Sequence, residues 1–385
     1  MTNRLTLDTR AVRAGLENCD VTGAVVPPLH LSSTYAFRGF GDKRKYDYSR
    51  SGNPTRDLLG EALADLEGGV GAVITGSGMG AITLVGHLLP IGARVIAPHD
   101  CYGGTFRLFT AWQKRGELAV EFVDFGNPAA VTAALAKPAA LVWIETPSNP
   151  LLRITDIADI AKRGHAIGAL VVADNTFLSP GWQRPIELGA DIVMHSTTKY
   201  INGHSDVVGG AVIAAKKEVA EQLSWWGNCL GLTGSAFDSY LTLRGLRTLH
   251  VRLREHGRNA QAIAEFLANQ SAVKRVYFPG LASHPGHELA KRQQSGFGAI
   301  VTIEVQGGLD GAKRFSEALE LFSLAESLGG VESLVAHPGT MTHAAMAPEA
   351  RAAAGLVDGL LRLSIGIEST DDLLRDLQNG IAALG

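Results

Sequence analysis

The sequence predicts an α/β fold, with a mostly parallel sheet in a large domain and a smaller C-terminal α/β domain. From about residue 60, short β-branched runs alternate with helical stretches, which is typical of a parallel sheet covered by helices on both faces. Near residue 240 the pattern changes to a long helical stretch, followed by alternating runs and further helices. Small and polar residues follow several predicted strands, at the sheet edge where such folds bind ligands.

The first 60 residues are expected to form an irregular arm. Val26-Pro27-Pro28 and Ser51-Gly52-Asn53-Pro54 interrupt regular structure. A polar N-terminal arm is usually disordered or packed on a neighbour, and its aromatic side chains favour packing. These aromatic residues are Tyr35, Phe37, Phe40, Tyr46 and Tyr48. The arm therefore indicates an oligomer.

The remaining elements are predicted from apolar runs and helical periodicity. The predicted strands of the large domain are residues 72–75, 93–97, 141–144, 170–173 and 191–194. Helices are predicted over 128–137 and 154–168, and a long, mostly uninterrupted helix over 239–270. A further strand is predicted over 299–305. The predicted organisation is an arm over 1–60, a large domain over 61–255 and a C-terminal domain over 256–385.

The composition excludes several classes of function. A length of 385 residues with 46% hydrophobic residues suits two domains with a large core. The net charge of -3 gives no electrostatic basis for binding nucleic acid or anionic membranes. Three cysteines without paired spacing indicate a reducing compartment. No signal-peptide core follows Met1, and no apolar run reaches the roughly 18 residues of a membrane span, so a cytoplasmic protein is expected.

Lys199 is the most informative residue of the chain. It follows a predicted buried strand and stands among small hydroxyl residues, which include Ser196 and Thr198. Burial disfavours the charged form of an amine, and a neutral amine can attack a carbonyl to form a Schiff base. The alternative interpretation is a lysine that extends from a strand end to solvent.

A glycine-rich turn over residues 76–81 follows the first predicted strand and opens a helix. Its backbone amides and the helix N-terminus would favour a phosphate. The turn also matches the dinucleotide-binding pattern, with Asp100 at about the expected distance of 20 residues. The motif alone does not decide which phosphate is bound, so a nicotinamide-dependent oxidoreductase stays an alternative.

Four further residues are candidates, each with a simpler alternative. Tyr102 could stack on a flat cofactor ring, or be a partly buried core tyrosine. Asp174 could pair with a protonated pyridine nitrogen, or cap a helix. Asn149 could donate to a ring hydroxyl, or be a turn residue before Pro150. Arg362 lies in an apolar run and could bind a substrate carboxylate, or form an internal salt bridge.

Other catalytic arrangements have less support. His284 and His287 are three residues apart, but no cysteine or acidic cluster accompanies them, so no metal site is expected. No Ser-His-Asp set has a supporting motif.

Taken together, these residues resemble the Cys/Met-metabolism family of pyridoxal 5'-phosphate (PLP) enzymes. Residues 191–204, DIVMHSTTKYINGH, are similar to that family's lysine signature, and the likeness extends over nearly the whole chain. Four stretches are more specifically similar to bacterial members that carry out γ-replacement: residues 25–28, 97–104, 237–240 and 345–351. The resemblance implies an aspartate-aminotransferase-like fold (fold type I) and a homotetramer of two dimers that share active sites.

The resemblance also implies roles for individual residues. PLP would form a Schiff base with Lys199. Tyr48 and Arg50 would bind the cofactor phosphate of the neighbouring subunit, and Gly78 and Met79 would supply phosphate amides. Tyr102 would stack on the cofactor and help to release Lys199, and Asp174 would hold the pyridinium. Support for the phosphate or for Lys199 would come from Ser196 and Thr198. The remaining roles concern the substrates: Arg362, Asn149 and the Ser327 backbone for the α-carboxylate, Glu326 for a distal amino group, and Arg107 for a succinyl carboxylate.

The implied reaction is replacement of the acyl group of an O-acylhomoserine by cysteine, which gives cystathionine in methionine biosynthesis. O-Succinylhomoserine is the favoured donor. Ser51 departs from this pattern, because an arginine would be expected there in γ-replacing members. The loss of that cation makes three alternatives plausible. The donor could be O-acetylhomoserine, the reaction could be γ-elimination of cystathionine, or one site could carry out both γ-replacement and γ-elimination.

Overall fold

The computed structural model describes residues 5–16, 19, 21–344, 351–352 and 354–385. It divides into two compact units, one of residues 1–90 and 172–250 and one of residues 91–171 and 251–385. The motif at 345–351 lies largely outside the described residues, which include only Arg351 of it. The boundaries expected near residues 60 and 255 stay a prediction. Within the described residues, no helix is long and apolar enough to cross a membrane.

The sheet of the first unit has the strand order β1-β7-β6-β5. The strands are β1 (Gly71–Thr75), β7 (Gly210–Ala214), β6 (Ile192–His195) and β5 (Leu170–Asp174). β5 belongs to this unit from Val172 onward. β5 and β6 are parallel, whereas β7 is antiparallel to both β6 and β1. The ends of β5 and β6 therefore meet at one edge, which carries Asp174 and the segment that follows His195.

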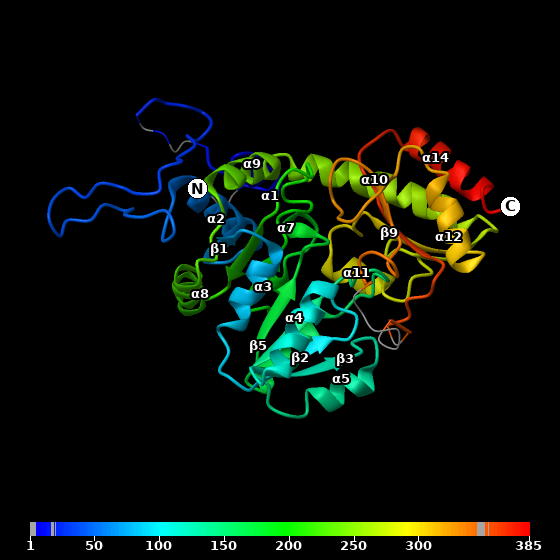
Figure 1. Ribbon diagram of the computed structural model, residues 1–385, viewed down its shortest axis with the longest axis horizontal. Coiled ribbons are helices and arrows are strands. Elements are labelled where there is room, and N and C mark those ends of the chain that lie inside the picture. Colours follow the sequence, from blue (N-terminus) through cyan, green and yellow to red (C-terminus); the bar gives the residue numbers. More distant parts are fainter. Residues whose placement is uncertain (1–4, 17–18, 20, 345–350, 353) are drawn as a thin grey trace. The chain divides into compact units, whose positions relative to one another are not determined.

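Helices of the first unit are α1 (Leu7–Val12), α2 (Pro54–Glu67), α3 (Gly78–Gly86), α7 (Ser179–Trp182), α8 (Lys217–Leu230) and α9 (Ala236–Leu246), with a 3₁₀ turn at Pro185–Leu188. The start of α2 is encoded locally, because the Asn53 side chain accepts from the amides of Thr55 and Arg56 and Pro54 stands at the first helical position. The helix ends at Gly68, whose φ of 79° suits glycine. α2 packs against β1, β7 and α9 (Figure 1).

The strands of the second unit fall into two groups. The first has the order β4-β2-β3, with β4 (Leu141–Glu145) and β3 (Leu118–Val123) both parallel to β2 (Ala93–Pro98). The second has the order β10-β11-β12-β9-β8 and is mostly antiparallel. Its strands are β10 (Ser323–Leu324), β11 (Leu334–Ala336), β12 (Leu360–Ser364), β9 (Ile300–Val305) and β8 (Val273–Tyr277).

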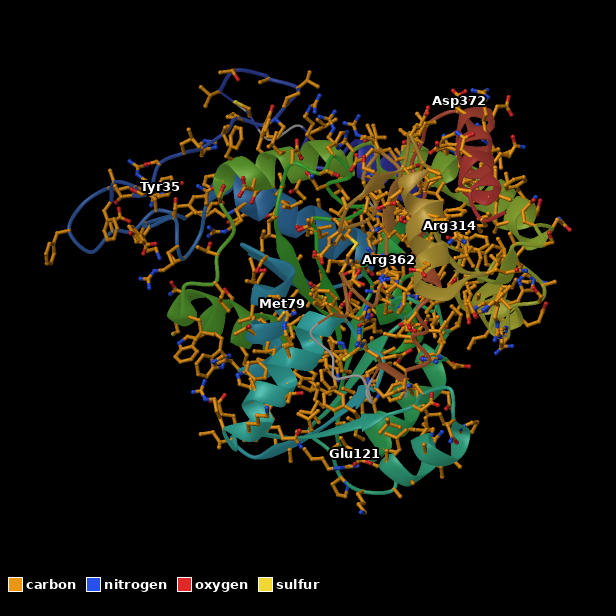
Figure 2. All side chains as sticks on the ribbon, turned by 45° about the vertical axis from the view of Figure 1, so that its right-hand side comes forward. Tyr35, Met79, Glu121, Arg314, Arg362 and Asp372 are labelled. Carbon is orange, nitrogen blue, oxygen red and sulfur yellow. The ribbon has the colours of Figure 1, made fainter. Side chains whose placement is uncertain are left out.

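Helices of the second unit are α4 (Gly103–Lys114), α5 (Pro128–Ala134), α6 (Ile157–Ala166), most of α10 (Leu249–Ala268), α11 (His287–Gln293), α12 (Gly308–Glu317) and α14 (Thr370–Ala382). Figure 2 marks Arg314 on α12 and Asp372 on α14, two helices that pack on each other. The predicted α/β class with a mostly parallel sheet is confirmed.

Two features differ from the sequence prediction. The stretch 239–270 is two helices, α9 and α10, because the Thr248 amide and hydroxyl both donate to the Gly245 carbonyl and close the first helix. The prediction did not name strands β3 and β7, and in the C-terminal part it named only the run that forms β9. β7 runs antiparallel to both of its neighbours, so the strand–helix–strand pattern of a parallel sheet did not reveal it.

Candidate functional site

The glycine-rich turn forms the start of α3, as predicted. The Ser77 hydroxyl caps the helix by accepting from the Gly80 amide at 3.0 Å. Gly78 lies so close to Ser196 that a Cβ at this position would be 2.9 Å from the Ser196 Cβ. Only glycine permits this approach, which brings Ser196 beside a helix N-terminus. Met79, labelled in Figure 2, is the second residue of α3. Ser77 was not among the predicted site residues, although its place before the glycines is a cap signal.

Asp174 ends β5 and is 8% exposed. Its Oδ1 accepts from the Thr176 amide at 3.0 Å, and the Thr176 hydroxyl accepts from the Ser196 amide at 2.9 Å. Burial raises the pKa of the Asp174 carboxyl, because the charged form loses its hydration. A protonated pyridine nitrogen would compensate for that loss. The alternative of a helix cap is not supported, because α7 begins only at Ser179.

Lys199 lies in a tight turn after β6. Its amide donates to the Ser196 carbonyl at 3.3 Å, and its carbonyl accepts from the Gly203 amide at 2.8 Å. The side chain is half-buried. The Thr198 hydroxyl accepts from the Gly209 amide at 2.9 Å and donates to the Gly209 carbonyl at 3.2 Å. Two roles were predicted for Thr198, phosphate binding and support of Lys199. Its bonds to Gly209 favour support of the Lys199 turn.

Arg362 is the centre of a polar cluster within the second unit. It lies in the middle of β12 and is 3% exposed (labelled in Figure 2). Its guanidinium donates to Asn149 Oδ1 at 3.0 Å and to the Ser327 carbonyl at 2.7 Å. The structure thus brings together the three residues predicted to bind an α-carboxylate. Both acceptors are neutral, so they orient the guanidinium without cancelling its charge.

The neighbours of Arg362 are themselves held in place. Ser327 has a φ of 87°, a conformation that costs free energy for a residue other than glycine and is enriched at functional sites. The His343 ring nitrogen Nε2 donates to the Asn149 carbonyl at 3.2 Å. Burial lowers the pKa of His343 to about 4, so the ring is neutral near pH 7 and adds no charge beside Arg362. Sequence reasoning missed His343, because no local motif surrounds it.

Three other predicted residues lie on exposed positions of the second unit. Tyr102 precedes α4, its amide donates to Glu145 Oε2 at 2.7 Å, and its side chain is 41% exposed. That exposure does not support a core tyrosine. Arg107 on α4 and Glu326 beside Ser327 are also exposed. All three can therefore be reached by a ligand.

Asp100 is occupied by protein contacts. It is 6% exposed, and one of its oxygens accepts from the Ser148 hydroxyl at 2.8 Å and from Arg153 Nη1 at 2.6 Å. A ribose-binding carboxylate must offer its oxygens to the ribose hydroxyls. The dinucleotide alternative therefore loses the acidic residue on which it depended.

The N-terminal arm is an extended loop that projects beyond α2 and α9 of its own unit (Figure 1). Backbone bridges join Thr34 to Tyr48 and Gly39 to Asp42, while the Phe40 side chain is fully exposed. Tyr48 is also exposed, and the Arg50 guanidinium carbon lies 5.8 Å from the centre of its ring. These exposed aromatic groups are suited to contact another molecule.

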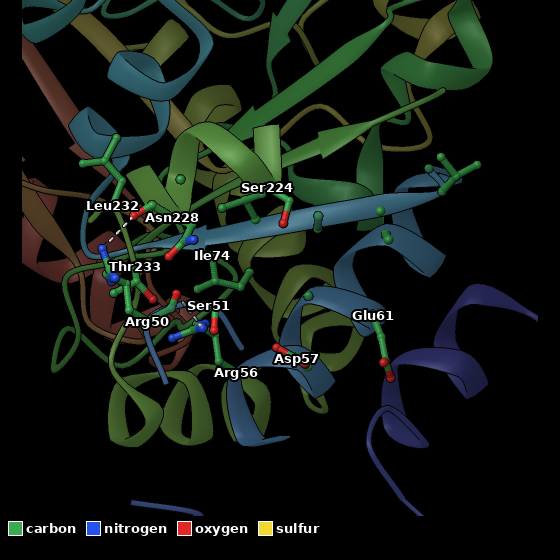
Figure 3. A pocket seen from close by; sticks show the side chains of 18 of the residues that line it. Arg50, Ser51, Arg56, Asp57, Glu61, Ile74, Ser224, Asn228, Leu232 and Thr233 are labelled. Carbon is green, nitrogen blue, oxygen red and sulfur yellow. Dashed lines mark hydrogen bonds between the residues drawn. The ribbon is translucent and has the colours of Figure 1, made fainter. Parts of the chain in front are cut away.

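Arg50 lines a cavity of about 570 Å³ at the base of the arm (Figure 3). Its Nη1 donates to the Asn228 carbonyl at 3.3 Å, and its own carbonyl accepts from Arg56 at 3.4 Å. Ser51 lines the same cavity, but its hydroxyl donates to Asp47 and to the Tyr48 carbonyl. Position 51 therefore contributes no cation and no free hydroxyl donor.

The first unit contains three groups that could hold PLP: a lysine on a strand-end turn, a buried carboxylate and a helix N-terminus that begins with glycine. Their arrangement fits the cofactor, because burial disfavours the charged form of Asp174, which a protonated ring nitrogen would stabilise, and Gly78 allows Ser196 to lie close to the start of α3. The class of protein that this fold and site define is a PLP-dependent enzyme of the aspartate-aminotransferase-like fold.

Comparison with known proteins agrees with this class. The model of the family described as "Cys/Met metabolism PLP-dependent enzyme" matches residues 8–382. The chain is 57% identical to cystathionine γ-synthase of Escherichia coli over 97% of each chain, and 46% identical to cystathionine γ-lyase of Dictyostelium discoideum over 98% of each. Crystal structures of cystathionine γ-synthase from Xanthomonas oryzae, one with aminoacrylate and cysteine and one with cystathionine, are 61% identical, with a TM-score of 0.98 over 99% of this chain and 98% of theirs. The chain belongs to the Cys/Met metabolism family of PLP-dependent enzymes.

Proposed function

We propose that this enzyme catalyses γ-replacement, in which the sulfur of cysteine displaces the acyl group of an O-acylhomoserine to give cystathionine. The observation that carries the proposal is full-length similarity to γ-synthases, at 57% and 61% identity. The favoured acyl group is succinyl. The product would serve methionine biosynthesis.

PLP would be held by residues of one subunit and, in the oligomer, by the arm of a neighbouring subunit. Lys199 would bind it through Nζ, Asp174 would face its ring nitrogen, and the amides of Gly78 and Met79 with Ser196 would bind its phosphate. Tyr102 would stack on its ring. When bound, PLP supplies an electron sink that stabilises negative charge at the substrate carbons.

The protein side chains would orient the substrate and move its protons. Arg362 would bind the α-carboxylate as a bidentate partner, oriented by Asn149 and the Ser327 carbonyl. Lys199 Nζ would take the proton from Cα and then act at Cβ, which allows the acyl group to leave Cγ as a carboxylate. A single mobile amine can serve several carbons in turn. Glu326 would bind the amino group of the incoming cysteine, and Arg107 the distal carboxylate of the donor.

γ-Elimination of cystathionine is the second candidate, as the only activity or in addition to γ-replacement. The observation that favours it is Ser51, whose hydroxyl bonds within the arm, so this position adds no positive charge for a succinyl group. It would release cysteine, 2-oxobutanoate and ammonia from the same site.

Purified protein is expected to absorb near ~420 nm, as lysine-bound PLP does, and to make cystathionine from O-succinylhomoserine only when cysteine is present. Absorbance and product chromatography would measure both. O-Acetylhomoserine tested in parallel identifies the acyl group. Cleavage of cystathionine without synthesis would replace γ-replacement by γ-elimination, and a protein that binds no added PLP would contradict both.

We further propose a homotetramer of two dimers, in which Tyr48 and Arg50 of one subunit bind the cofactor phosphate of its neighbour. The projecting arm and its exposed aromatic side chains support this arrangement. The substrates are small amino acids. Free cysteine, the proposed thiol, stays reduced in the cytoplasm, which supports a cytoplasmic location.

Arg50→Ala is expected to weaken PLP retention in the neighbouring subunit's site rather than in its own. Arg50→Ala and Lys199→Ala subunits, mixed by refolding, should complement each other, because a hybrid dimer keeps one intact site. Random pairing would restore roughly a quarter of the wild-type activity, since half of the dimers are hybrids with one of two sites intact. Arg38→Ala, an exposed substitution on the same arm, serves as the control. Absence of complementation would contradict the shared site.

A further inference from the structure

Glu67, the last residue of α2, is a fully buried carboxylate that joins two strand ends. Its Oε1 accepts from Asn175 Nδ2 at 2.8 Å and lies 2.6 Å from His195 Nε2. Glu67, Asn175 and His195 are all 0% exposed. A single carboxylate oxygen therefore binds side chains that follow β5 and end β6.

These two side chains are adjacent in sequence to the proposed cofactor residues. Asn175 follows Asp174, and His195 precedes Ser196 in the segment that leads to Lys199. Asp174 is paired with Met194 in the parallel register of β5 and β6. The position of Asp174 relative to the Lys199 turn therefore depends on how these two strand ends are held together.

The Asn175 side chain is fixed from a second direction. Its Nδ2 also donates to the Gln183 carbonyl at 2.8 Å, and its Oδ1 accepts from Gln183 Nε2 at 3.0 Å. Three hydrogen bonds thus fix the orientation of the Asn175 side-chain amide. Thr176 connects the same two strand ends separately: its amide donates to Asp174 Oδ1, and its hydroxyl accepts from the Ser196 amide. Asp174 and Ser196 are therefore connected by two independent sets of hydrogen bonds.

Stability alone does not account for the Glu67 cluster. Among the residues that the structure describes, buried Glu67 Oε2 and His195 Nδ1 have no hydrogen-bond partner. A buried polar network that is only partly satisfied is less favourable than an apolar core of the same shape. Its position under the cofactor residues suggests a different role.

We propose that Glu67 is a positioning residue for the cofactor, which holds Asp174 and the Lys199 turn in register through Asn175 and His195. The proposal rests on the cofactor roles of Asp174 and Lys199 proposed above. Loss of Glu67 would let the two strand ends move independently, so the ring nitrogen and the lysine-bound carbon of PLP would no longer be held at a fixed separation.

The test uses apoprotein reconstituted with PLP, and it measures the dissociation constant and the visible circular dichroism of bound PLP. Glu67→Ala should weaken PLP binding by about 10- to 100-fold, the range seen when outer partners of metal ligands are removed, and should reduce the visible signal. Asn175→Ala, which removes one side of the cluster and keeps the carboxylate, should shift both quantities in the same direction. Glu67→Gln keeps one accepting oxygen and should restore part of the loss.

Asp376→Ala is the matched control, because Asp376 is another buried carboxylate and accepts from the amides of Glu320, Leu321 and Phe322. It should lower the melting temperature but leave PLP affinity unchanged. Wild-type affinity and signal in Glu67→Ala, or in Asn175→Ala if the first variant does not fold, would overturn the proposal. Equal loss in Asp376→Ala would also overturn it, because the effect would then be general destabilisation. A wild-type apoprotein that fails to bind PLP would instead refute the underlying cofactor roles.

Discussion

Lys199→Ala is expected to abolish turnover while the protein still binds PLP noncovalently. The phosphate and ring contacts proposed for the other residues do not involve the lysine amine, whereas the proposed proton transfers at the substrate carbons do. Loss of a general acid–base group alone costs about 10²–10⁴-fold in rate, and the loss of the covalent attachment adds to it. Cystathionine formation measures the activity, and the visible spectrum should shift away from that of a lysine-bound form.

Lys217→Ala is the control for this change, because Lys217 is an exposed lysine at the start of α8 in the same unit. It should keep wild-type rates and the wild-type spectrum. Normal activity in Lys199→Ala would refute the proposed mechanism.

Arg362→Ala is expected to lower kcat/KM strongly, although less than Lys199→Ala does. The substitution removes a buried guanidinium that would make a charge-assisted bidentate bond to the substrate, and it leaves the α-carboxylate without a partner. Truncating one member of such a pair costs about 2–5 kcal/mol, which corresponds to roughly 30- to 5,000-fold in kcat/KM. Steady-state kinetics with O-succinylhomoserine would measure the change.

Two companion variants distinguish charge from geometry. Arg362→Lys keeps the charge but cannot reproduce the planar pair of bonds to Asn149 and Ser327, so an intermediate loss is expected. Arg375→Ala removes an exposed arginine of α14 that pairs with Asp372, and it should leave kcat/KM unchanged. If Arg362→Ala retained the wild-type kcat/KM, another group would have to bind the carboxylate. PLP affinity should not change in any of these variants, since Arg362 is assigned to the substrate.

The predicted strands were confirmed because each is a short, mostly apolar run, and that signal depends only on neighbours in sequence. The position of Asp174 at the end of β5 and the cap of α3 by Ser77 follow from equally local patterns. The break between α9 and α10 was missed, because it depends on the Thr248 amide and hydroxyl, which both donate to the Gly245 carbonyl. β7 was missed because it pairs antiparallel with both β6 and β1, and its pairing with β1 joins segments far apart in the chain.

The sequence by itself determined the fold class and the family, and it indicated the lysine on which the proposed chemistry depends, because each is expressed by residues close together in the chain. The tertiary structure alone decided which distant residues meet. Arg362 and Asn149 are 213 residues apart, and Glu67 and His195 are 128 apart, yet each pair forms a buried hydrogen bond. Such contacts depend on the path of the folded backbone, and no local spacing encodes a distance through space.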